Sequence, residues 1–119
     1  MHEYPITLEI IRLAENAARG KNASKVGKIV LVIGDLSGYV GDSVQLYFDE
    51  ISRGTLCDGA ILEIRRVRSQ VQCADCGLLF ERKPFSYECP SCGGEAHPTK
   101  IGTEFYIEYI EVETENGKN

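Results

Sequence analysis

The chain has 119 residues, of which 43% are hydrophobic, and its formal net charge is −5. This length suits one domain or one domain with a small insertion, and the composition excludes a disordered tail. The negative charge argues against broad nucleic-acid affinity, because binding to phosphates requires clustered lysine and arginine. No apolar run approaches the roughly 18 residues of a transmembrane helix, and no secretory signal is recognisable, so we expect a cytoplasmic protein.

The first half of the chain predicts two helices with a strand between them. Residues 5–20 carry apolar side chains at helical spacing, which predicts an amphipathic helix. Residues 26–34 are mostly apolar and β-branched, which predicts a strand that is covered on both faces. After a glycine-rich connection, Asp42 is expected to cap a second helix, with Gln45 three residues on and Gly54 as the stop.

The second half predicts two more strands, over residues 60–69 and 104–113, with a stretch rich in Gly, Pro, Cys and polar residues between them. That stretch lacks the apolar residues for a core of its own and would depend on metal to fold. We therefore predict an α+β fold with a small three-stranded mixed sheet, two helices and an inserted zinc-ribbon-like domain. The expected boundaries are a discontinuous α/β domain of residues 1–69 plus 102–119 and a zinc-binding domain of residues 70–101.

Four cysteines form the pattern C-x2-C-x12-C-x2-C, and they are Cys73, Cys76, Cys89 and Cys92. Four thiolates at this spacing fill a tetrahedral shell around a soft metal and leave no position for water, which indicates a structural site. Zinc is the preferred metal, and iron in a rubredoxin-like site is the alternative. The fifth cysteine, Cys57, has no partner motif and is predicted to be a small buried hydrophobic residue.

The first three residues place a terminal amine, an imidazole and a carboxylate together, from Met1, His2 and Glu3. Nitrogen-rich donors of this kind suit Ni(II) or Cu(II) in square-planar or tetragonal geometry. We expect these residues to lie exposed just ahead of the first helix, and an ordinary chain start is the alternative interpretation. The one other histidine is His97. It is either a surface loop residue or an additional metal ligand, which would bind nickel or lie next to the zinc site.

No nucleophile and base stand out as a catalytic pair, and no phosphate-binding glycine loop is present in the sequence. We therefore predict that the chain is not an enzyme. A metal carrier is the first hypothesis. The alternatives are a zinc-ribbon module that binds protein or nucleic acid without nickel transfer, and a rubredoxin-like electron carrier.

Three features together resemble the HypA/HybF family of hydrogenase nickel incorporation proteins. They are the Met1-His2-Glu3 start, the Ile33-Gly34-Asp35-Leu36-Ser37-Gly38 segment, and the pair Cys73-x2-Cys76-Gly77 and Cys89-Pro90-x-Cys92-Gly93. Chain length and element order also agree, so the resemblance covers essentially the whole chain. Many ribbons share the cysteine motif, but its combination with this start in a short chain is specific.

The resemblance implies a nickel metallochaperone for the maturation of [NiFe] hydrogenase. It implies that His2 binds Ni(II), that Glu3 tunes this site, and that the four cysteines hold structural Zn(II). The implied partners are the GTPase HypB and the hydrogenase large subunit, with urease accessory proteins as further partners in some bacteria. A weak homodimer is also implied, and neither nucleic acid nor membrane is an expected partner.

Overall fold

The structure is a computed structural model, and it describes residues 3–114. The elements in chain order are α1 (Glu3–Gly20), β1 (Ala23–Gly34), α2 (Gly41–Ile51), β2 (Ile61–Val67), β3 (Val71–Cys73), β4 (Leu79–Phe80), β5 (Ala96–Pro98) and β6 (Phe105–Thr114). A mixed sheet has the order β2-β1-β6, with β2 parallel and β6 antiparallel to β1. A second, antiparallel sheet has the order β4-β3-β5. The predicted α+β fold is confirmed.

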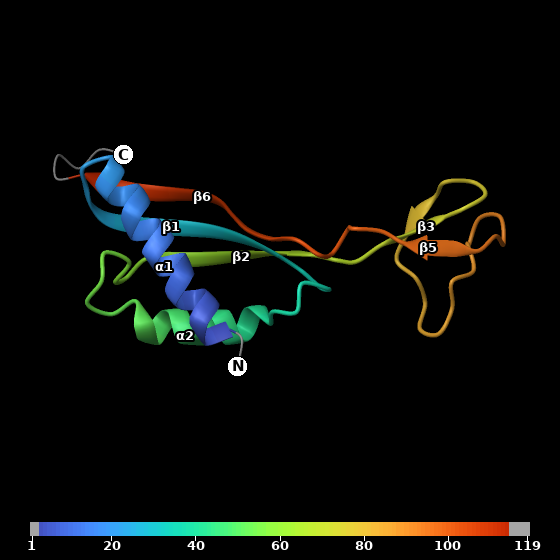
Figure 1. Cartoon of the computed structure of the whole chain (residues 1–119), viewed down its shortest axis with the longest axis horizontal. Helices are drawn as coiled ribbons and strands as arrows, with labels where there is room; N and C mark the ends of the chain where they lie inside the picture. Colours follow the sequence, from blue (N-terminus) through green and yellow to red (C-terminus); the bar gives the residue numbers. More distant parts are fainter. Residues whose placement is uncertain (1–2, 115–119) are drawn as a thin grey trace.

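The two helices cover the same face of the mixed sheet, and the second sheet lies beyond it along the long axis of the molecule (Figure 1). The main core lies under the helices, where Phe48 of α2 and Ile29 and Leu31 of β1 are almost completely buried. Burial of each such side chain stabilises the fold by about 1.5–3 kcal/mol. Within residues 3–114, no helix is both long enough and apolar enough to cross a membrane.

Within residues 3–114 no helix covers the opposite face of the mixed sheet, but β1 is buried on both of its faces, which confirms the expectation. Val30 and Val32 of β1 point to this face, yet they are only 0% and 5% exposed. Their neighbours across the sheet are long or aromatic side chains, with Glu63 and Tyr109 flanking Val30. The stems of these side chains cover the valines, while their polar groups remain in contact with water.

A narrow neck joins the mixed sheet to the second sheet (Figure 1). Here the backbone that follows β1 is hydrogen bonded to both segments that lead to the cysteines. The N–H of Asp35 donates to the Val67 carbonyl at 2.9 Å, and the N–H of Leu36 donates to the Gly102 carbonyl at 2.6 Å. The N–H of Gly34 donates to the Glu104 carbonyl at 2.8 Å.

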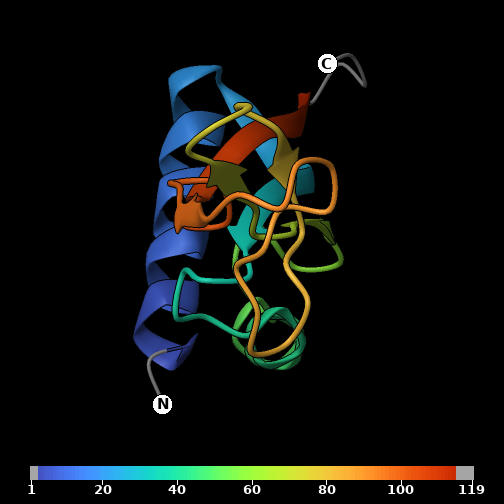
Figure 2. The same ribbon diagram turned by 90° about the vertical axis from the view of Figure 1, so that its right-hand side faces the viewer.

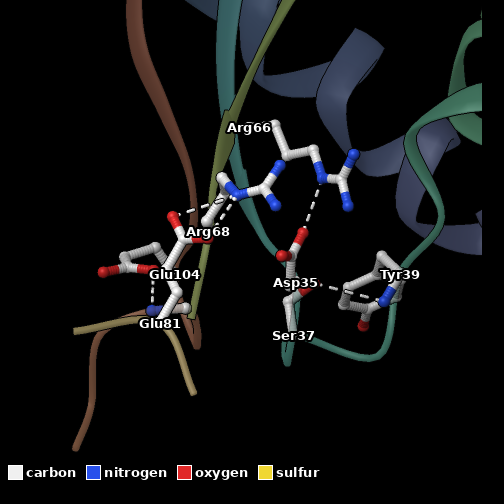
Figure 3. A network of polar contacts seen from close by, with 8 residues as sticks. Asp35, Ser37, Tyr39, Arg66, Arg68, Glu81 and Glu104 are labelled. Atoms are coloured by element: carbon white, nitrogen blue, oxygen red, sulfur yellow. Dashed lines mark hydrogen bonds and ion pairs between the residues drawn. The ribbon is translucent and has the colours of Figure 1, made fainter. Parts of the chain in front are cut away.

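Side chains reinforce the neck on its surface (Figure 3). Arg66 of β2 donates to the Asp35 carboxylate at 2.6 Å, and this hydrogen bond lowers the pKa of Asp35. Arg68 donates to both carboxylate oxygens of Glu81, at 3.0 and 3.1 Å. The first contact links β2 to the loop after β1, and the second links the segment after β2 to the segment after β4.

We expect Gly34→Ala to destabilise the protein by about 1–3 kcal/mol, as overpacked sites do. A Cβ at Gly34 would lie 2.0 Å from the carbonyl oxygen of Gly102, so the backbone itself would have to move. Thermal or denaturant unfolding measures the effect. Gly20→Ala is the matched control, since a Cβ there would meet nothing within 4 Å. Equal stability of the two variants would contradict the close packing of the neck.

Candidate metal centres

The four predicted cysteine ligands converge in the second sheet and its turns. Their sulfur atoms all lie within 4.8 Å of one another, and among residues 3–114 they form the only cluster of three or more metal-ligating side chains. The sulfurs of Cys73 and Cys92 lie 3.4 Å apart, and those of Cys76 and Cys89 lie 3.6 Å apart. A tetrahedral metal with sulfur bonds of about 2.3 Å requires sulfur separations of about 3.8 Å. The cluster therefore fits a tetrahedral four-thiolate metal.

Each CxxC turn directs backbone N–H groups at its first sulfur. The N–H groups of Asp75 and Cys76 both lie 3.4 Å from the sulfur of Cys73, and the N–H of Ser91 lies 3.4 Å from that of Cys89. Donation from the Cys76 N–H lowers the pKa of the Cys73 thiol to about 6. The thiolate is the metal-binding form, so each turn favours coordination by its first sulfur.

Gly94 is a residue of this centre that sequence reasoning missed. A Cβ at this position would lie 2.5 Å from a carboxylate oxygen of Asp75 and 3.1 Å from the sulfur of Cys73. The absence of a side chain lets the second CxxC turn approach the first. The signal in the sequence was the doubled glycine after Cys92, of which only Gly93 was considered as a turn residue.

Glu3 occupies a different position from the one expected. It is the first residue of α1 and is only 7% exposed, instead of lying exposed ahead of the helix. Its carboxylate accepts a hydrogen bond from the N–H of Val40 at 3.0 Å. Val40 is the N-cap of α2, where unpaired N–H groups favour a negative charge. Met1 and His2 lie outside the described residues.

The same contact explains why the prediction of Asp42 as the helix cap was wrong. Helix α2 begins at Gly41, so Asp42 lies inside its first turn. The N-cap residue is Val40, whose own side chain makes no capping hydrogen bond. The carboxylate at the cap comes from Glu3, which is remote in sequence. Gln45 does not complete a capping box either, because its side-chain amide donates to Asp49 at 3.0 Å.

The remaining two candidates lie apart from the four sulfurs. His97 is exposed on β5, opposite Gln72, and belongs to no metal-ligating cluster among residues 3–114. Its part in a nickel site stays a prediction. Cys57 is completely buried in the main core, which confirms the prediction, and burial raises the pKa of its thiol to about 11.

Fold and site together define a small metal-binding protein, in which a four-thiolate ribbon is inserted into an α/β unit. Comparison with known proteins makes the assignment specific. Residues 1–112 match the sequence profile of the HypA family, described as hydrogenase/urease nickel incorporation, metallochaperone. The chain belongs to the HypA family.

Relatives and solved structures agree with this assignment over nearly the full length. The hydrogenase maturation factor HypA of Caldanaerobacter subterraneus is 42% identical over 114 residues, covering 95% of this chain and all of the relative. The same factor of Dehalococcoides mccartyi is 39% identical, covering 98% of each chain. The solution structure of the nickel metallochaperone HypA from Helicobacter pylori superposes with a TM-score of 0.63 at 27% identity, covering 95% of this chain and 98% of that one.

We expect Glu3→Ala to lower the unfolding midpoint, because it removes the acceptor at the start of α2. Chemical denaturation followed by circular dichroism measures the effect. Glu50→Ala is the control, since Glu50 lies exposed near the end of α2 and its replacement also removes one acid but leaves the Glu3–Val40 contact intact. If both variants unfolded at the same denaturant concentration, the Glu3 contact would have no stabilising role.

Proposed function

We propose that this chain carries Ni(II) for the maturation of [NiFe] hydrogenase and holds structural Zn(II) at Cys73, Cys76, Cys89 and Cys92. Membership of a nickel metallochaperone family over residues 1–112 is the observation that carries the proposal, since it includes the Met1-His2-Glu3 start. The family is one of carriers, which agrees with the expectation that the chain is not an enzyme.

In this proposal the terminal amine of Met1 and the side chain of His2 bind the nickel. The position of Glu3 supports a role for it in presenting these donors. Its contact with Val40 ties the start of α1 to the start of α2 and so fixes the position of Glu3 itself. Glu3 then tunes the site from beside it or adds a carboxylate oxygen, and His97 is a further candidate ligand.

The four-thiolate centre supports a different role for its metal. Its described donors form a closed, sulfur-only shell with sulfur separations that suit tetrahedral zinc. Zinc there would hold the β3–β5 sheet together, and it would not be transferred. We propose residues 70–101 as this zinc-binding domain and residues 1–69 plus 102–119 as the nickel-binding domain.

The partners follow from the same family assignment and are part of the proposal. The family description supports a recipient in hydrogenase maturation, and it names urease as well. We propose HypB as the cooperating GTPase and the hydrogenase large subunit as the recipient, in the cytoplasm, with urease accessory proteins as a second route and weak homodimerisation of the carrier.

We expect untagged protein to bind one zinc tightly and one nickel more weakly, and His2→Ala to weaken nickel binding by at least about tenfold while it retains zinc. Removal of the imidazole takes away one nickel donor but leaves the thiolates intact. Metal analysis and Ni(II) titration measure both. His97→Ala, which removes the other histidine of the chain, measures separately whether His97 adds to the nickel site, and the parent chain is the reference for both variants. Unchanged nickel affinity in His2→Ala would refute the N-terminal site.

Cys76→Ala should give the converse result, with zinc lost and nickel binding kept. Three remaining thiolates cannot close the shell, and the small sheet has little else to hold it. Metal content and amide hydrogen exchange over residues 70–101 measure the loss. Cys57→Ala is the control, since this thiol is buried in the other part of the molecule. Full zinc content in Cys76→Ala would contradict the four-thiolate site.

A further inference from the structure

Phe85 is the most exposed large hydrophobic residue among those the structure describes. Its side chain is 103% exposed, whereas Phe48 is 1% exposed and the other two phenylalanines are partly buried. It lies at the tip of the loop between the two CxxC turns, which we call the ribbon loop and define as residues 81–87. A fully exposed phenyl ring contributes nothing to the stability of the folded chain.

The backbone of Phe85 is also unfavourable for this residue. Its φ is 62°, in the left-handed region that bulky side chains rarely adopt. The N–H of Ser86 donates to the Lys83 carbonyl at 3.1 Å, with Pro84 and Phe85 between them. Proline at the second position and positive φ at the third are typical of a type II turn, in which glycine is the usual third residue. The tip thus carries phenylalanine where glycine would fit better.

The ribbon loop is held in one conformation by contacts at its base. The guanidinium of Arg82 lies 4.6 Å from the centre of the Tyr87 ring, and Arg82 also donates to the Lys83 carbonyl at 3.2 Å. The carbonyl of Tyr87 accepts from the N–H of Ala96 at 2.8 Å. A preformed loop loses little conformational entropy on binding, so its exposed ring is suited to act as an anchor.

The charge around the tip indicates what kind of surface it fits. Residues 82–87 contain Arg82 and Lys83 and no acid, so the loop is cationic on the side that precedes Phe85, whereas Glu88 and Glu95 line the hollow on its other side. Glu81, just before Arg82, is already paired with Arg68. An apolar ring flanked by two exposed cations complements an apolar pocket with carboxylates at its edge.

The ribbon loop and the first turn of α1 project to the same side of the molecule. Figure 1 shows both below the level of the mixed sheet, and Figure 2, which looks along the molecule, shows the loop descending on the side of α2. A protein that takes nickel from the start of the chain would therefore approach the side on which the loop projects. No such argument applies to the opposite, open face of the sheet.

We propose that the ribbon loop docks onto the protein that receives the nickel, with Phe85 entering an apolar pocket and Arg82 and Lys83 meeting carboxylates at its rim. This inference rests on the proposed function, because that function supplies the recipient. The loop is a second contact, separate from the metal donors, and it makes affinity for the recipient depend on residues that bind no metal.

The test measures binding of the full-length, zinc-loaded chain to purified nickel-free hydrogenase large subunit. We expect Phe85→Gly to weaken binding at least tenfold and to leave its zinc content and nickel affinity unchanged. Because glycine suits the positive φ, the variant should be as stable as the parent or more so, which separates lost binding from misfolding. Tyr106→Ala is the control, since Tyr106 is 51% exposed on the open face of the mixed sheet.

A charge reversal tests the rim. Lys83→Glu should also weaken binding, mainly through slower association, whereas Lys100→Glu makes the same change outside the loop and should have little effect. Parent-like affinity in Phe85→Gly, or no binding of the large subunit by the parent chain, would overturn the proposal. The proposal would also be overturned if the chain bound a single-stranded oligonucleotide instead of the large subunit, in a manner that depended on Phe85 and on salt concentration. Nickel titration of the same samples reports on the proposed function independently.

Discussion

The backbone from Gly34 to Leu36 is the constraint on which the rest of the structure depends. Three consecutive N–H groups there donate to Glu104, Val67 and Gly102, which belong to the two segments entering and leaving the cysteine-bearing sheet. The same segment continues into Val40, whose N–H is bound by Glu3. One short stretch therefore fixes the base of the ribbon and supports the start of α1. Its conformation requires glycine at position 34, because the Gly102 backbone occupies the space of a side chain.

The two parts of the molecule are stabilised by different physical means. Under the helices, a continuous apolar core includes residues from α1, α2 and all three strands of the mixed sheet. Around the four sulfurs, the buried residues are few and small, and they are Val71, Cys73, Cys89 and Ala96. So small an apolar core cannot offset the entropy of ordering about thirty residues. Coordination must supply the difference, so a metal held there for folding is unsuited to being given away.

The sequence was sufficient for the two helices, the three strands of the mixed sheet and the sulfur ligands, because these depend on local spacing, but it did not predict the short strands β3, β4 and β5. Apolar periodicity located α1 and β1, and the CxxC spacing located the cluster. The sequence was insufficient to predict the contact of Glu3. Its partner Val40 is 37 positions away and contributes its backbone N–H, which every residue except proline has, so the residue type gives no signal. The sequence was also insufficient for Gly94 and Phe85, because a close approach and a positive φ become visible only in the fold.

The open face of the mixed sheet explains why docking falls to other surfaces. Lys28, Glu63, Arg65 and Glu108 form a continuous chain of ion pairs across it, with separations of 2.9 to 3.0 Å. A partner that buried this face would remove water from four charges that already satisfy one another, and desolvation would offset much of the gain. The tip of the ribbon loop carries no such penalty at its apolar ring. This difference in desolvation cost favours docking through the surface that carries the ribbon loop and the start of α1. The open face of the mixed sheet then remains exposed to solvent.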